Sequence, residues 1–300
     1  MPPEVIVGPG DDAAALLLPP DELCVTTTDS VIAGVHFDPE TTAPESIGRK
    51  AVARCVSDLA AMAAGPIAVL GAAHLPQKYN MESAQKIVRG MLSAAEEIGV
   101  ALIGGDIAVH EGNLSITVTA IGAAPPKRIV LRSGARKGDR VCVTGELGGS
   151  LLGHHLRFMP RTTEALWLAE HATLHAMIDI SDGLLLDAWR IARDSQIGIV
   201  IDPILLPISS AAHEAAKSSG RTAVQHALGD GEDYELLFTV PRRAAKRLMA
   251  LGDLPVRVTV IGEVVPEEGL WLKEENGARR PVVPAGWVHG FGMVSPTPTA

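Results

Sequence analysis

The chain has 300 residues, enough for two domains, and its cores must be aliphatic because it holds only four Phe, four Trp and two Tyr. The net charge of −9, without any run of Lys and Arg, makes nucleic acid and anionic membranes poor partners. No apolar run reaches the length of a membrane span and the N-terminus lacks the features of a signal peptide, so we expect a cytoplasmic protein.

Strand and helix patterns alternate in the first half of the chain. Apolar residues at every second position predict strands over 22–31 and 113–122. Helical spacing predicts helices over 44–64 and 81–99, and the second of these ends on a glycine, a natural C-cap. Residues 100–106 are predicted to form a short buried strand that runs into a turn.

Two prolines and a cluster of basic residues interrupt the periodicity over 122–140. We therefore predict one domain over 1–130 and a second over 131–300, with a disordered tail at about 293–300. Predicted strands of the second half are 139–145, 198–202, 233–240 and 256–264. Residues 146–158 are predicted to form a Gly-rich turn that leads into a helix, and further helices are predicted over 182–195 and 241–252. Because each half mixes helix with alternating strands, both domains are expected to be α+β and mostly antiparallel.

The three cysteines lie far apart in the sequence. They are Cys24, Cys55 and Cys142, and no C-x-x-C or metal-type spacing occurs. We interpret all three as reduced core residues.

Six segments place a carboxylate at a strand or turn end, beside small residues and next to apolar sequence. They are "GPGDDAAALLL", "TTTDSVIAG", "RCVSDLAAM", "LIGGDIAV", "AMIDISDGLLLDAW" and "LGDGEDYELLF". A carboxylate removed from water needs a partner, because burying an unpaired charge is too costly. Oxygen ligands without Cys or His favour Mg²⁺, and acids around several magnesium ions can hold a nucleotide triphosphate.

Each of these acids also has a purely structural explanation. The alternatives are a helix N-cap for Ser181 or Asp182, a turn cap for Asp12, and ion pairs of Asp58 with Arg54 and of Asp187 with Arg190. Similarly, the glycine-rich segment Thr144–Gly153 could present N–H groups to a phosphate or pack tightly against a neighbour. It matches neither the P-loop nor the Rossmann pattern.

Three other candidates are equally open from the residues alone. His36 is interpretable as a buried structural histidine, Arg132 as a surface arginine of the linker, and Trp287 as a hydrophobic latch on the second domain. The sequence contains no motif for a nucleophilic Ser or Cys, and its ten histidines form no triad-like set.

In their order along the chain, these segments resemble the thiamine-monophosphate kinase family, a branch of the AIR synthetase-like superfamily. The matching pieces are "GPGDDAAAL", "TTTDSVIAGVHF", "KAVARCVSDLAAMAAGP", "LIGGD", "LRSGARKGDRVCVTG", "DISDGLLLD", "GDGEDYELLFTV" and "VIGEV". They span residues 8 to about 264. The resemblance implies two α+β domains, of which the N-terminal one, a mixed sheet with helices, pairs with its copy to form a homodimer.

The same resemblance implies site residues position by position. Those that match magnesium ligands are Asp12, Thr27, Thr28, Asp29, Asp58, Asp106, Asp179 and Asp182. Those that match ATP contacts are Gly105, Asp106, Arg132 and Ser181. Those that match contacts to thiamine phosphate are His36, Glu232 and Trp287.

The activity implied is ATP-dependent phosphorylation of thiamine monophosphate to thiamine diphosphate, by direct in-line transfer assisted by several Mg²⁺ ions. No general base is expected, because the second pKa of a phosphate monoester is about 6 and its attacking oxygen is largely ionised at neutral pH. Two alternatives remain at this stage. One is a related ATP-dependent enzyme of the selenophosphate- or AIR-synthetase type, and the other is a non-catalytic nucleotide-binding homologue.

Overall fold

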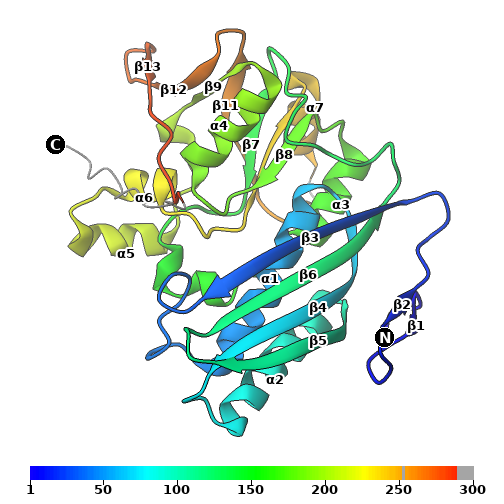
Figure 1. The fold of residues 1–300 in the computed structure, drawn as a ribbon. Helices are drawn as coiled ribbons and strands as arrows, with labels where there is room; N and C mark the ends of the chain where they lie inside the picture. The colour runs from blue at the N-terminus through cyan, green and yellow to red at the C-terminus, as the bar shows by residue number, and fades with distance from the viewer. Residues whose placement is uncertain (252–253, 289–300) are drawn as a thin grey trace.

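The first half of the chain folds around a four-stranded sheet (Figure 1), in a computed structural model that describes residues 1–251 and 254–288. Its strands are β3 (Leu23–Ile32), β4 (Gly65–Pro76), β5 (Ala101–His110) and β6 (Ser115–Ala124). Their order is β3-β6-β4-β5, and only the β4/β5 pair is parallel. A small hairpin of β1 (Val5–Val7) and β2 (Ala15–Leu16) precedes this sheet.

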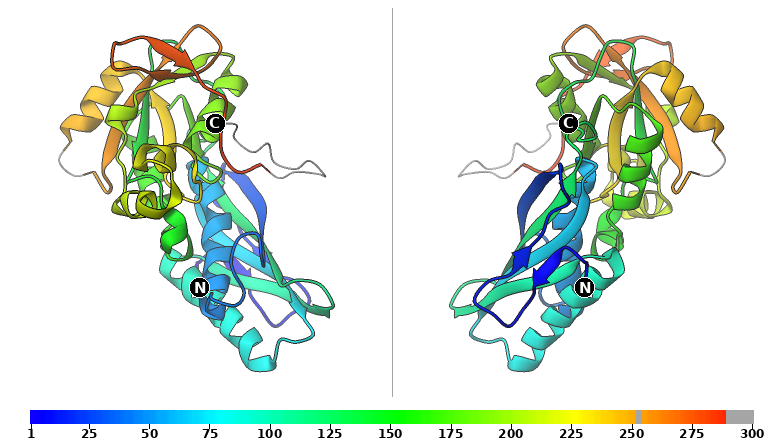
Figure 2. Two further views of the ribbon diagram at one scale, coloured as in Figure 1. Left: turned by 90° about the vertical axis from the view of Figure 1, so that its left-hand side faces the viewer. Right: turned by 90° about the vertical axis from the view of Figure 1, so that its right-hand side faces the viewer.

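Two helices, α1 (Pro44–Ala61) and α2 (Met81–Ile98), cover one face of this sheet (Figure 2). They cross closely because Gly48 of α1 and Gly90 of α2 have no side chains. The α2 helix ends as predicted at Gly99, whose φ of 85° provides the left-handed C-cap. Helix α1 also packs against α3 (Thr162–His171) and β8 (Ala176–Asp179), so it links the two halves of the chain.

The second half is built on a seven-stranded sheet of order β13-β12-β9-β11-β7-β10-β8. Besides β8, its strands are β7 (Arg140–Thr144), β9 (Gly198–Ile201), β10 (Leu236–Val240), β11 (Val258–Val265), β12 (Gly269–Lys273) and β13 (Arg279–Pro281). All neighbouring pairs are antiparallel except β12/β9. The predicted α+β class with mostly antiparallel sheets is therefore confirmed. The predicted boundary between residues 130 and 131 lies in the irregular segment before β7 and stays a prediction.

Besides α3, the helices of the second half are α4 (Leu184–Ser195), α5 (Ser210–Ser219), α6 (Ala223–Gly229) and α7 (Arg242–Ala250). The helix predicted to follow the Gly-rich turn within 146–158 is wrong, because this segment contains only two 3-10 turns, Ser150–Leu152 and His154–Leu156. Gly153 between them has a φ of 121°, which no α-helix can include. A third 3-10 turn spans Pro203–Leu205.

Two further predictions are corrected in the first sheet. Strand β5 does not turn after Gly105 but continues to His110, paired with β4. The second correction concerns Cys24, which is exposed, whereas Cys55 and Cys142 are buried as predicted. In β3, Val25 and Val31 face the helices, so Cys24 falls on the opposite face of the strand.

Within residues 1–251 and 254–288, no helix is both long and apolar enough to cross a membrane. The cytoplasmic location stays a prediction. The tail predicted to be disordered, 293–300, lies outside the described residues.

Candidate active site

A cleft of about 740 Å³ lies where the two halves of the chain meet. One wall comes from β3 and the end of α1, and the other from the linker, β8 and α4. Five residues predicted for the site line it together: Thr27, Asp58, Arg132, Asp179 and Ser181. Its apolar lining includes Leu59, Met62, Leu131 and Met177. The cleft thus combines an apolar wall with a set of acids and hydroxyls.

Two carboxylates in this cleft, the half-buried Asp58 and the buried Asp179, form no ion pair within the described part of the chain. Asp58 Oδ2 accepts a hydrogen bond from Thr27 Oγ1 at 2.6 Å, and Asp179 Oδ2 accepts one from Ser57 Oγ at 2.7 Å. Loss of hydration raises the pKa of Asp58, and burial together with the charge of Asp58 raises the pKa of Asp179 to about 8. Two such carboxylates with a threonine hydroxyl fit a divalent cation.

Two other predicted acids, Asp29 and Asp182, have protein cations as partners, so neither needs a metal ion to balance its charge. Arg54 pairs with Asp29, not with Asp58 as the structural alternative proposed. Arg190 pairs with Asp182, and its Nη1 lies 2.6 Å from Oδ1 of Asp187. The alternative pairing of Asp187 with Arg190 is therefore confirmed.

The N-cap predicted at Ser181 or Asp182 is also wrong. Gly183 occupies the N-cap of α4 and has no side chain to cap it. Instead, Oδ2 of Asp187 in the first turn accepts the backbone N–H groups of Asp182 and Gly183, both at 3.1 Å. This turn holds Ser181 and Asp182 at the mouth of the cleft.

A second cluster lies further toward the N-terminus of α1 and joins two residues predicted to contact the acceptor substrate. Lys50 is fully buried, and its Nζ donates to Glu232 Oε1 and Oε2 at 2.9 and 2.7 Å and to the backbone oxygen of His36 at 2.6 Å. Burial lowers the pKa of Lys50, and the charge of Glu232 offsets part of this effect. Nδ1 of the His36 ring accepts the N–H of Ile32 at 3.0 Å. This contact supports the structural interpretation of His36 and is also compatible with its predicted role in substrate binding.

The backbone that presents Glu232 is strained. Glu232 and Tyr234 have φ angles of 55° and 51°, values that are costly for residues with a side chain. For this reason β10 begins at Leu236 and not at residue 233 as predicted. The Tyr234 ring stacks on Phe158 with centroids 3.9 Å apart, and its buried hydroxyl has no hydrogen-bond partner among the described residues. Strain of this kind is often found at functional sites.

Some predicted ligands lie elsewhere. Asp12, Gly105 and Asp106 line a separate pocket of about 550 Å³ on the sheet face opposite the helices, with Thr117 and Thr119. Thr28 reaches the same face, where Thr119 Oγ1 donates to its hydroxyl at 3.3 Å. Thr27 and Thr28 point to opposite faces because side chains alternate along β3.

The eight predicted magnesium ligands are therefore divided between two pockets and two ion pairs, those of Asp29 and Asp182. Among residues 1–251 and 254–288, no three His, Cys, Asp or Glu side chains are grouped closely enough to hold a metal ion. The complete ligand set stays a prediction.

Trp287 and Arg132 lie at the margin of the cleft. The backbone N–H of Trp287 donates to the carbonyl of Asp182 at 2.8 Å, which places this segment beside the Ser181–Asp182 turn. The side chain of Trp287 is 50% exposed, more than a hydrophobic latch would be. The Arg132 side chain is 55% exposed and its Nε lies 3.8 Å from Asp194.

Two N–H groups at the centre of the glycine-rich segment bind side chains of the protein itself. The N–H of Gly148 donates to Asp233 Oδ1 at 2.9 Å and that of Gly149 to Asp230 Oδ2 at 3.0 Å. A Cβ at Gly148 would lie 2.6 Å from the backbone nitrogen of Ala227. The alternative of tight packing is therefore confirmed for this segment.

Asp233 should make stability depend on pH. Its Oδ2 is buried without a hydrogen-bond partner in residues 1–251 and 254–288. Burial raises the pKa of Asp233 to about 7, although hydrogen bonds from Ser150 and Gly148 oppose the shift. Because the folded-state pKa exceeds that of the unfolded chain, the stability contributed by the protonated form is lost as pH rises through about 7.

We expect Asp233→Asn to retain both acceptor bonds and to remove this loss. Its melting temperature should exceed that of the wild type increasingly between about pH 5 and about pH 8, measured by calorimetry. Parallel curves for the two proteins would contradict the assignment.

Three residues important to this geometry are absent from the sequence-based set: Lys50, Arg54 and Ser57. For Lys50 and Arg54, the only local signal is their four-residue spacing with Asp58, which places the three residues on one side of a helix. Their partners Glu232 and Asp179 are too distant in sequence for that spacing to identify.

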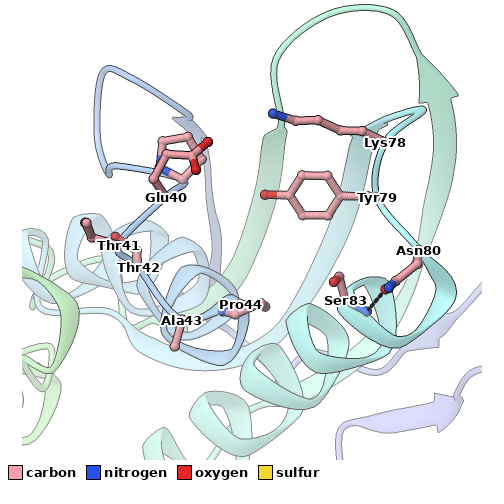
Figure 3. A pocket seen from close by; sticks show the side chains of 10 residues that line it. Glu40, Thr41, Thr42, Ala43, Pro44, Lys78, Tyr79, Asn80 and Ser83 are labelled. Carbon is pink, nitrogen blue, oxygen red and sulfur yellow. Dashed lines mark hydrogen bonds between the residues drawn. The ribbon is translucent and has the colours of Figure 1, made fainter.

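A different hollow, of about 540 Å³, lies between residues 39–44, which lead into α1, and residues 78–83, which begin α2 (Figure 3). The Asn80 side chain accepts the N–H of Ser83 there at 2.8 Å and caps α2. None of the predicted site residues lines this hollow.

Comparison with known proteins identifies relatives over nearly the whole chain. The family models for the N-terminal and C-terminal domains of AIR synthase related protein match residues 10–124 and 136–273. A curated relative named thiamine-monophosphate kinase, from Rhodopirellula baltica, is 43% identical over 296 residues, which cover 96% of this chain and 92% of the relative.

Solved structures agree with this relationship. The thiamine-monophosphate kinase of Stenotrophomonas maltophilia superposes with a TM-score of 0.81 at 34% identity, over 92% of this chain and 93% of that one. The structure of AaThiL complexed with AMPPCP and TMP superposes with a TM-score of 0.80 at 30% identity, over 91% and 89% of the two chains.

Proposed function

We propose that this chain, which belongs to the thiamine-monophosphate kinase family of AIR synthase related proteins, transfers the terminal phosphoryl group of ATP to thiamine monophosphate and releases ADP and thiamine diphosphate. The observation that carries the proposal is the 43% identity to a curated kinase over 96% of the chain. The complex of a 30% identical structure with AMPPCP and TMP supports the same pair of substrates.

The cleft supports ATP as the donor. Its apolar wall, with Met62, Leu131 and Met177, suits a nucleobase. Arg132 and Ser181 line the same cleft, and we propose that they contact the polar part of the nucleotide. Asp58 and Asp179, with the hydroxyl of Thr27, are the residues that would hold Mg²⁺ in this cleft. When bound there, Mg²⁺ would neutralise the phosphate charges of the two polyanions, which otherwise repel by about 4 kcal/mol per pair of unit charges at 4 Å and an effective dielectric constant near 20.

The acceptor needs orientation more than activation. Its phosphate oxygen is already ionised at neutral pH, since the second pKa of a monoester is about 6. We propose that His36, Glu232 and Trp287 bind thiamine phosphate, with Lys50 holding Glu232 and the backbone of His36 in place. No side chain has to remove a proton from the nucleophile.

The exposed face of the first sheet suits a homodimer contact. This face carries the second pocket with Asp12, Gly105 and Asp106, and two residues of β3, Cys24 and Ile32, are exposed on the same face. Exposed apolar side chains on a sheet face are typical of an interface. We propose that two copies pair through this face and that the acids of the second pocket join the metal set there.

A direct assay tests the activity and its alternatives. Purified protein with ATP, Mg²⁺ and thiamine monophosphate should form ADP and thiamine diphosphate in equal amounts, separated by ion-exchange chromatography. Formation of ADP without thiamine diphosphate would favour a related ATP-dependent enzyme with another acceptor. Binding of a non-hydrolysable ATP analogue with Mg²⁺, seen as a raised melting temperature without any product, would favour the non-catalytic homologue.

A further inference from the structure

The proposed acceptor site and donor site lie at different positions along helix α1. Lys50, Arg54 and Asp58 follow at intervals of four residues, about 6 Å of helix rise each. At the level of Lys50 lie the acceptor-side contacts to Glu232 and His36. At the level of Asp58, about 12 Å further along, lie Thr27 and Asp179, the donor side of the cleft. The phosphoryl group must therefore be transferred through the region between Lys50 and Asp58.

Arg54 occupies that intermediate level. Its guanidinium pairs with Asp29 through Nε, and its Nη1 lies 3.9 Å from Glu232 Oε1. The side chain is 13% exposed, so it is desolvated yet not sealed from the space beside it. Burial acts to lower the pKa of Arg54, but the charges of Asp29 and Glu232 raise it above its ordinary value, so the group stays cationic.

The arrangement leaves Arg54 with donors that no described residue uses. A guanidinium has five N–H groups in a planar fork. Within residues 1–251 and 254–288, the hydrogen bonds of Arg54 use Nε toward Asp29, and the 3.9 Å separation from Glu232 is an ion pair without a hydrogen bond. Lys50 differs, because its three ammonium protons are all directed at Glu232 and the His36 backbone. Of these two cations, Arg54 is the one that can bind a further anion.

We propose that Arg54 is a catalytic residue that binds the phosphoryl group during its transfer from ATP to thiamine monophosphate. This inference rests on the proposed kinase function. The bond from the terminal phosphorus of ATP to its bridging oxygen breaks, a bond to the acceptor phosphate oxygen forms, and ADP leaves with the electron pair. The guanidinium exchanges no proton and stabilises the negative charge spread over the transferred group.

Replacement of Arg54 tests this role. Arg54→Met should lower kcat about 100-fold or more, while the KM values for ATP and thiamine monophosphate change by less than about threefold, because the interaction is made mainly in the transition state. Arg54→Lys, which retains the positive charge beside Asp29 and Glu232, should have an intermediate kcat and a melting temperature close to that of the wild type.

The matched control is Arg49→Met. Arg49 lies on the same helix with 18% of its side chain exposed, but it pairs with Glu97 and donates to the backbone oxygen of Phe158 outside the cleft. Its replacement should leave kcat unchanged. A purely structural role of Arg54 would show as a raised KM for thiamine monophosphate at unchanged kcat, and that result would overturn the proposal.

Chemical rescue gives a second readout. In Arg54→Ala, added guanidinium ion should restore part of kcat, because it can occupy the vacated space, whereas it should not activate Asp58→Asn. Lack of rescue together with wild-type kcat in Arg54→Lys would also overturn the proposal. If the wild-type protein itself forms no thiamine diphosphate, the proposed function fails first, so the two failures are distinguishable.

Discussion

Replacing Asp58 by Asn is expected to lower kcat by about 1,000-fold or more and to raise the melting temperature of the metal-free protein. Asp58 and Asp179 are half-buried and buried acids that pair with no cation in the described part of the chain, and the charge of Asp58 contributes to the raised pKa of Asp179. An amide at position 58 removes the repulsion between them and the charge that would hold Mg²⁺, so activity and stability should change in opposite directions.

The fold should tolerate this change. In the variant, the oxygen of the new amide side chain can still accept the hydroxyl of Thr27, which donates to Asp58 Oδ2 at 2.6 Å in the wild type. Steady-state kinetics and calorimetry at about pH 8 would measure both effects. Asp38→Asn is a suitable control, since Asp38 is an exposed acid in the loop before the same helix. Wild-type kcat in Asp58→Asn would show that Asp58 holds no essential metal.

The second large effect concerns the crossing of α1 and α2. We expect Gly90→Ala to lower the free energy of unfolding by about 3 kcal/mol or more. A Cβ at this position would lie 1.9 Å from the backbone oxygen of Glu45, and backbone cannot yield as a flexible side chain does. Alanine is otherwise favoured over glycine in a helix by about 1 kcal/mol, so the clash decides the sign.

The crossing also positions the site. Helix α1 carries Lys50, Arg54, Ser57 and Asp58, and separating it from α2 would displace all four. The Gly90→Ala variant should therefore be less active than the wild type as well as less stable, and denaturant unfolding would measure its stability. Gly229→Ala in α6 is the matched control, because its Cβ would meet only the end of the Arg221 side chain at 3.6 Å. An equal effect of both substitutions would refute the packing argument.

Local patterns correctly predict elements whose signal is contained in a short window. Strand β6 and the residue before it have Leu114, Ile116, Val118 and Ala120 buried on one face, and this period-two pattern is visible in the sequence. Strand β4 was not predicted, since its run of Gly, Ala and Pro carries little strand propensity. Strand β5 continues past Gly105 because only glycine fits there: a Cβ would lie 2.0 Å from the backbone oxygen of Gly71 in β4. That neighbour is visible only once the strands pair.

The candidate site is likewise predictable only in part from the sequence. Apolar surroundings identified the acids that need a partner, and for Asp58 and Asp179 the described residues provide no ion-pairing cation. For Asp29 and Asp182 they provide Arg54 and Arg190. Local sequence cannot distinguish these cases, because the choice of partner depends on which way each side chain points.

Residue periodicity and composition alone therefore establish two α+β domains, aliphatic cores and a set of acids beside apolar strands. Long-range packing decides how those acids are neutralised and which cleft they share. Lys50 meets Glu232 across 182 residues, and Ser57 meets Asp179 across 122. The physical reason is that periodicity is a property of neighbouring residues, whereas an ion pair or a shared hydrogen bond requires two distant segments to be brought within about 3 Å by the packing of the whole fold.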